Sequence, residues 1–207
     1  MAATGKKIYR DSAFGEAIHP WINKPDTKYN EAGLYKVDLL LSGKEAEEEK
    51  ARIDQAAEAA FEEMTAEMTP GERKKWSIYR PYEAQEDDEG NPTGLTVFSF
   101  RQNATIRLKD STTKAIKISI QDAKGKDTSA AIFGGSIIRV RYTMRPIKMV
   151  STKQIGVRLD FSMVQIKKLG TGSGGRGFGA IEDISDDDFV AGEGNSQPTN
   201  AAADGDY

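Results

Sequence analysis

Strands with one apolar and one basic face recur through the second half of the chain, and this repeat limits the fold more than any other feature. Five segments there alternate in polarity or are rich in β-branched and aromatic residues: 95–101, 104–109, 114–121, 136–144 and 154–167. In the fourth segment Ile138, Val140 and Tyr142 share one face. Its other face carries Arg139 and Arg141. Such strands bury one face only, so the pattern predicts a sheet or barrel with a basic outside.

The same design appears in two further places. In the last segment, the expected inner face holds Ile155, Val157, Leu159, Phe161 and Met163. An earlier strand is predicted over 29–41, with its inner face formed by Tyr35, Val37, Leu39 and Leu41. A first strand is predicted over 6–18. We assign Phe61, Tyr142 and Phe161 to the core.

A helix is predicted between the early and the late strands. Apolar residues recur there at helical spacing: Ile53, Ala57, Phe61, Met64 and Met68. Ser42 followed by Glu45 predicts a capping box, and Thr69 before Pro70 predicts the start of a short second helix. The helical insertion is expected at about 43–77. A loop is expected from 79 to 94, acidic from about 83 onward. Short strands with one inserted helix indicate a mainly β chain, as a small closed or partly open barrel rather than a βαβ sheet.

Charge is distributed unevenly along the chain. The formal net charge is −3, but Leu95 to Arg176 holds sixteen Lys and Arg against four Asp. Ile181 to Tyr207 holds eight carboxylates and no Lys or Arg. The expected organisation is a body at 1–168, a Gly-rich linker at 169–180 and a disordered acidic tail at 181–207. This asymmetry predicts a body that binds a polyanion and a tail that competes for the same surface. The alternative is a tail that only aids solubility.

Several classes of activity find no support in the sequence. The chain has no cysteine and one histidine, His19, so thiol catalysis is excluded and no triad is indicated. The stretch 170–175 matches GxGxxG, yet no helix pattern follows it to hold a phosphate. Arg176-Gly177-Phe178 is either plain linker or a segment that contacts single strands. No enzyme activity, metal or cofactor is expected. No apolar run of about 18 residues or standard leader is present, so the cytoplasm is the expected location.

Aromatic residues interleave with basic ones, as binding of single-stranded nucleic acid requires. Phosphates are neutralised by Lys and Arg, while bases stack on ring faces. Each ring could equally belong to the core. The candidate residues for stacking are Trp76, Tyr79, Tyr82 and Phe98, and those for phosphate contact are Lys36, Arg101, Lys117, Arg139, Arg141 and Arg158.

A basic barrel, an inserted helix, a Gly-rich linker and an acidic tail together resemble phage single-stranded DNA-binding proteins. The tail carries Asp186, Asp187, Asp188 and Phe189, and it ends in Asp206 and Tyr207. The resemblance implies an OB-fold-like core and sequence-independent binding of single-stranded DNA in phage replication, recombination or repair. It also implies that one of the two acidic–aromatic tips docks replication proteins such as a polymerase or a helicase-primase. Duplex DNA binding is expected once the tail is removed. The oligomeric state stays open, with a homodimer as one alternative.

Two other functions remain alternatives at this point. One is a non-enzymatic phage structural or scaffolding protein whose basic face binds an acidic protein surface. The other is a magnesium-dependent nuclease, which would cut strands rather than only bind them.

Overall fold

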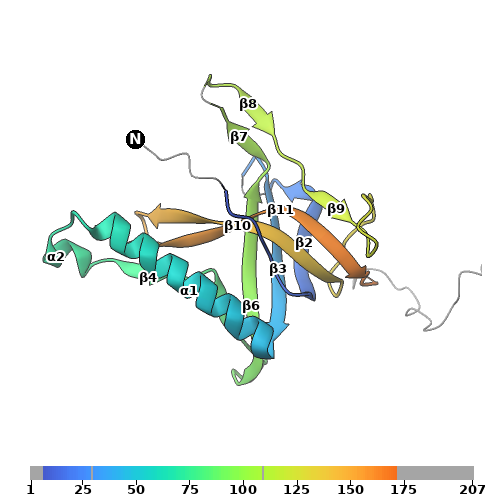
Figure 1. The fold of residues 1–207 in the computed structure, drawn as a ribbon, viewed down its shortest axis with the longest axis horizontal. Helices are drawn as coiled ribbons and strands as arrows, with labels where there is room; N and C mark the ends of the chain where they lie inside the picture. The colour runs from blue at the N-terminus through green and yellow to red at the C-terminus, as the bar shows by residue number, and fades with distance from the viewer. Residues whose placement is uncertain (1–6, 29, 109, 172–207) are drawn as a thin grey trace, which may run out of the picture. The chain divides into compact units, whose positions relative to one another are not determined.

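The computed structural model describes residues 7–28, 30–108 and 110–171. Five long strands form a closed barrel (Figure 1). They are β2 (Gly15–Asp26), β3 (Leu34–Ser42), β6 (Pro92–Asn103), β10 (Ile137–Met149) and β11 (Gln154–Lys168). Each pairs with the next in the ring β2-β3-β6-β11-β10, and β10 returns to β2. Only the β6–β11 pairing within this ring is parallel. The prediction of a mainly β, OB-fold-like barrel with an inserted helix is confirmed.

The barrel interior is filled by the faces that the sequence pattern marked as apolar. Val37, Leu39, Phe100, Tyr142 and Phe161 are fully buried. Tyr142 meets Phe100 edge-on, with ring centres 5.2 Å apart. Phe61, which lies on the inserted helix, is also buried. The assignment of Phe61, Tyr142 and Phe161 to the core is confirmed.

The inserted helix α1 (Gly43–Thr65) contacts β11, β10 and β3. It buries Ile53 and Ala57 against the barrel, as its spacing predicted. Buried Glu49 accepts a hydrogen bond from the Tyr142 hydroxyl and pairs with Arg52. The helix is thus attached to the core by a polar contact as well as by apolar packing.

The predicted cap of α1 is wrong, whereas that of the second helix is confirmed. Ser42 is the last residue of β3 and makes no side-chain cap, because the chain turns at Gly43 with φ of 57°. The short helix α2 (Pro70–Arg73) has a complete capping box between Thr69 and Glu72.

The segment expected to be a loop contains strands. β4 (Ser77–Tyr79) pairs with β11, and β5 (Tyr82–Glu86) forms a hairpin with β6. The acidic run makes the turn of this hairpin, where Asp87 accepts backbone hydrogen bonds from Glu89 and Asn91. The Pro, Gly and acidic residues of this segment are typical of a turn, which the structure contains. They gave no indication that β5 and β6 pair on the two sides of that turn.

Two predicted strands are each divided in the structure. The first becomes β1 (Arg10–Asp11) and the start of β2. The segment 114–121 becomes β8 (Thr113–Ala115), which pairs with β7 (Thr105–Arg107), and β9 (Ser119–Gln121), which pairs with β11. The hairpin of β7 and β8 forms a separate two-stranded sheet that projects from the barrel (Figure 1).

A bulge in β11 reverses which residues face outward. The β10–β11 register shifts between Arg141 and Tyr142, which pair with Met163 and Phe161, so Ser162 has no partner. Beyond this point Val164 and Ile166 are buried instead of Met163. The expectation that Met163 lies inside is wrong, because one extra residue exchanges the two faces of a strand.

No helix in the described part of the chain is long and apolar enough to cross a membrane. The linker from 172 onward and the acidic tail lie outside the described residues. The predictions for Asp186, Asp187, Asp188, Phe189, Asp206 and Tyr207 concern that part of the chain.

Candidate nucleic-acid interface

One group of candidate residues lies in a row across the outer face of three strands. Trp21 of β2 pairs with Lys36 of β3, which pairs with Arg101 of β6. Arg158 of β11 lies near them, with a hydrogen bond to the Asn103 side chain at 3.1 Å. Trp21 is 44% exposed, and the Lys36 amine lies 5.8 Å from its ring centre. We call Trp21, Lys36, Arg101 and Arg158 the Trp21 cluster.

Carboxylates of the same face pair with the cations of this cluster. Asp26 accepts from Lys36 at 2.7 Å, and Asp38 accepts from Arg101 at 2.9 Å. The hydrogen bond from Lys36, helped by a backbone N–H, holds the pKa of Asp26 below its usual range. These contacts fix the direction of each cation and also reduce the positive potential of the surface.

A second group surrounds Phe14, which lies just before β2. The Phe14 ring is 40% exposed, with the Arg139 guanidinium carbon 5.2 Å and the Lys167 amine 5.6 Å from its centre. Arg139 also donates to the Gln165 side chain at 2.8 Å. We call Phe14, Arg139, Gln165 and Lys167 the Phe14 cluster. Its exposed ring beside two cations suits one stacked base with adjacent phosphates.

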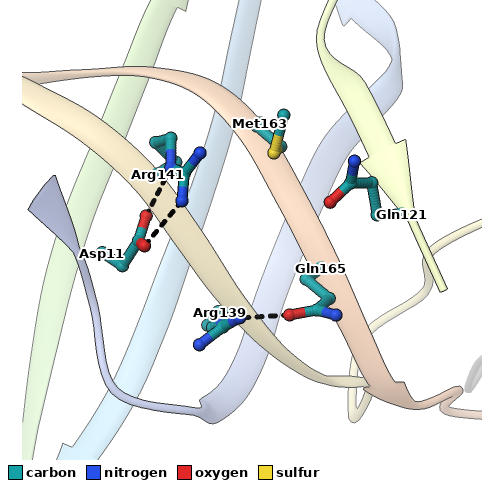
Figure 2. A pocket seen from close by; sticks show the side chains of 6 residues that line it. All are labelled: Asp11, Gln121, Arg139, Arg141, Met163 and Gln165. Carbon is teal, nitrogen blue, oxygen red and sulfur yellow. Dashed lines mark hydrogen bonds and ion pairs between the residues drawn. The ribbon is translucent and has the colours of Figure 1, made fainter. Parts of the chain in front are cut away.

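Arg141 lies next to the Phe14 cluster in a small polar hollow, shown in Figure 2. Asp11 holds it through two hydrogen bonds of 2.7 and 2.8 Å. This contact lowers the pKa of Asp11 below its ordinary value. Met163 and Gln165 line the same hollow because the bulge at Ser162 turns them outward. The bulge therefore brings polar and soft side chains to the outer face of β11.

Trp76 lies elsewhere, on the side of the β10–β11 hairpin that faces the helices. Lys148 and Lys153 place their amines 4.7 and 5.1 Å from the Trp76 ring centre. Met64 and Met68 line the same open hollow of about 480 Å³. Lys148 is an even number of residues from Tyr142 and thus on the inner side of β10. The structure does not bring Trp76 together with the two clusters on the outer face.

Two further predicted aromatic residues belong to the packing of the body. Phe98 is fully buried, so its assignment to base stacking is wrong. In the sequence, Phe98 alternates with Val97 and Ser99, a pattern that is compatible with Phe98 on either face of the strand. In the structure, the pairing of β6 with β3 places Phe98 on the inner face. Tyr82 packs on Phe98 with ring centres 5.7 Å apart and donates to Asp54 of α1 at 2.7 Å. Burial, followed by Asp54, raises the pKa of Tyr82 to about 12.

Tyr79 and Lys117 complete the predicted set. Tyr79 is half-buried in β4, where its carbonyl would lie 1.9 Å from a Cβ added at Gly156. Only glycine allows this approach of β4 to β11. Lys117 is exposed in the connection between β8 and β9.

Phe14 was not predicted from the sequence, because the cations beside it, Arg139 and Lys167, come from β10 and β11, far along the chain. Trp21 is absent from the list of candidate residues, although its place after Pro20 left it outside the assigned core. The cation beside its ring, Lys36, comes from the next long strand, β3, rather than from a local basic run. The described residues contain no group of three or more His, Asp or Glu side chains that could hold a metal ion.

A closed five-stranded barrel with exposed rings and cations on its outside is a form used by proteins that bind nucleic-acid strands. Comparison with known sequences gives the particular family. The family described as "Single-stranded DNA-binding protein, Bacteriophage T7" matches residues 15–169. The chain belongs to this family of phage single-stranded DNA-binding proteins.

Individual relatives agree with this assignment. The single-stranded DNA-binding protein of Enterobacteria phage T3 is 30% identical over 93% of this chain and 89% of the relative. The single-stranded DNA-binding protein of Escherichia phage T7 is 32% identical over 90% of this chain and 86% of the relative. The crystal structure of gp2.5, a single-stranded DNA-binding protein encoded by bacteriophage T7, has a TM-score of 0.68 at 26% identity and covers 90% of this chain and 100% of its own. The single-stranded DNA-binding protein of bacteriophage Enc34 in complex with single-stranded DNA has the same fold, with a TM-score of 0.54 at 15% identity, over 80% of this chain and 89% of its own.

Proposed function

We propose that this chain binds single-stranded DNA without sequence preference along the outer face of β10 and β11 and the strands beside them. The observation that carries the proposal is the Phe14 cluster, in which an exposed ring lies beside two cations of neighbouring strands. Stacking on a ring tolerates any base, while Lys and Arg contact the phosphates. Membership of the phage family supports the same function.

The contact surface we propose includes both clusters and their basic neighbours. Bases stack on Phe14 and Trp21, and phosphates follow Arg139 and Lys167. The remaining predicted phosphate contacts are kept where the fold leaves them accessible, at Lys36, Arg101, Lys117, Arg141 and Arg158. The other predicted rings lie outside this surface: Trp76 is beside the helices, Tyr79 is half-buried in β4 and Tyr82 packs on Phe98.

The tail and the biological setting form a second part of the proposal. We infer that the protein acts in phage replication, recombination or repair in the host cytoplasm. The tail docks a partner such as a polymerase or helicase-primase through Phe189 or Tyr207 and their neighbouring acids, and it competes with DNA. The charge contrast between tail and body supports this proposal.

The test is equilibrium binding to a fluorescent single strand and to a duplex of equal length, each at low and high salt. The proposal predicts preference for the single strand and weaker binding at high salt. Equal affinity for both forms, or binding to one sequence alone, would contradict it. Release of shortened fragments with magnesium would indicate a nuclease instead.

A further inference from the structure

Asp160 bridges two arginines on the outer face of the barrel. Its two carboxylate oxygens accept from Arg145 Nε at 2.6 Å and from Arg158 Nε at 2.5 Å. Arg145 and Arg158 are direct partners across β10 and β11. Two like charges in that position repel one another, so the carboxylate between them is what keeps both guanidinium groups close.

The bridge leaves most guanidinium donors free. Each guanidinium has five N–H groups, and the contact with Asp160 uses Nε of each. Arg158 donates once more, to the Asn103 side chain. The side chains of Arg145 and Arg158 are 49% and 22% exposed, whereas that of Asp160 is 15% exposed. A phosphate can therefore reach Arg145 most readily and Arg158 at its exposed edge, while Asp160 is the least exposed of the three.

The same arrangement recurs across this face. Asp38 holds Arg101, and Asp26 holds Lys36. Asp11 holds Arg141. A surface selected only for tight binding of a polyanion would not place a carboxylate against so many of its cations, because each one repels the phosphates.

We propose that Asp160 is an affinity-setting residue of the DNA-binding face, holding Arg145 and Arg158 in position while it opposes the approach of phosphate. This inference rests on the proposed function. Asp38 acts in the same way on Arg101. The consequence is binding weaker than the cations alone would give, so that a bound strand can be exchanged for another strand or a partner.

The size of the effect follows from charge separation. A carboxylate about 6 Å from a phosphate weakens binding by about threefold in bulk water and by roughly a hundredfold at the effective dielectric near a protein surface. We expect Asp160→Asn to tighten binding to an oligothymidylate strand on the order of tenfold at low salt. Asparagine keeps one oxygen that can accept from an arginine, so the variant preserves part of the bridge.

The experiment compares Asp160→Asn and Asp38→Asn with wild type. The control variant is Asp88→Asn, because Asp88 lies in the turn between β5 and β6. All three substitutions change the net charge equally, so the control removes the effect of overall charge. Binding is measured by fluorescence anisotropy over a range of salt, and thermal unfolding checks that each variant folds. The expected result is tighter binding by the first two variants, not by the control. The log–log salt slope should also steepen by about 0.7 for each phosphate newly neutralised.

The outcomes separate this inference from the proposed function. If folded Asp160→Asn and Asp38→Asn bind equally or more weakly than wild type, the carboxylates only position the arginines and the inference is overturned. If Asp160→Asn does not fold, Asp38→Asn decides by the same criterion. If wild type and Asp88→Asn do not bind single-stranded DNA at low salt, the proposed function fails, and the inference fails with it.

Discussion

The guanidinium carbon of Arg139 lies 5.2 Å from the centre of the exposed Phe14 ring. The two residues come from segments more than a hundred positions apart and meet because β10 and the start of β2 are neighbours in the barrel. An aromatic face with a cation beside it serves both parts of a nucleotide, because the base can stack while the phosphate is neutralised.

Phe14→Ala should weaken binding to single-stranded DNA by about 1–3 kcal/mol, the usual loss for one stacked base. The salt slope should not change, since no charge is removed. Phe133→Ala is the matched control, because Phe133 is 50% exposed but lies in the turn before β10. Equal losses in the two variants, measured by anisotropy titration, would show that Phe14 has no special role.

Arg139→Gln tests the charge beside the ring. This variant should make the log–log salt slope of binding shallower by about 0.7 per lost phosphate contact.

The two tryptophans should report binding unequally. Trp21 lies on the outer face beside Lys36, whereas Trp76 faces the helices beside Lys148. The chain has only these two tryptophans, so Trp76→Phe and Trp21→Phe each leave a single indole. Saturating oligonucleotide should quench emission from Trp21 and leave that of Trp76 nearly unchanged. The reverse pattern would place the stacking surface on the helix side of the β10–β11 hairpin.

Tyr82 should contribute to stability in a pH-dependent way. Its pKa is raised to about 12, by burial and then by the bond to Asp54, so the folded state favours the neutral phenol. The contribution is therefore complete below the ordinary tyrosine pKa of about 10 and is lost as pH rises from there toward the folded value. Near pH 8, Tyr82→Phe should lower the free energy of unfolding by about 0.5–1.5 kcal/mol, the net value of one hydrogen bond.

Denaturant titrations of wild type and Tyr82→Phe at pH 8 and pH 11 measure this difference. The gap between the two proteins should narrow at the higher pH. Tyr142 and the other tyrosines are common to both, so their ionisation cancels in the comparison. A gap that stays constant or widens would mean that the Tyr82 phenol is not held neutral by the fold.

Removal of residues 181–207 should tighten binding of single-stranded DNA at low salt and permit binding of duplex DNA. The tail carries eight carboxylates and no Lys or Arg, so it competes with phosphates wherever it reaches the basic face. Tethering gives it an effective concentration in the roughly millimolar range, and salt screens the contact over about 8–10 Å. Titrations of full-length and truncated protein at two salt concentrations measure the effect. Equal affinities at low salt would leave the tail as a solubility or docking element only.

The alternation of residues predicted the barrel strands and most of the core correctly. Val37, Leu39, Tyr142 and Phe161 are inside because period-two patterning leaves a strand one way to bury its apolar face. The pattern could not reveal the bulge at Ser162, since an unpaired residue depends on the partner strand. It therefore assigned Met163 to the wrong face.

The candidate site was harder to predict because its parts come together only in the folded chain. Local basic runs drew attention to Trp76, but the cations beside Phe14 come from β10 and β11. Phe98 lay next to basic residues in sequence and is nevertheless buried by the pairing of β6. The carboxylates that pair with the outer arginines were also unforeseen, since Asp11 and Arg141 meet only across the β1–β10 pairing.

The most direct test of the proposed interface is photocrosslinking of a single strand containing iododeoxyuridine, with the crosslinked residues identified by mass spectrometry. This reaction requires a base in contact with a side chain, so it reports the stacking surface itself. The predicted result is crosslinking at Phe14 and Trp21, which disappears in competition with unlabelled single strand. Crosslinks confined to Trp76 and Tyr79, with none on the outer face of the barrel, would contradict it.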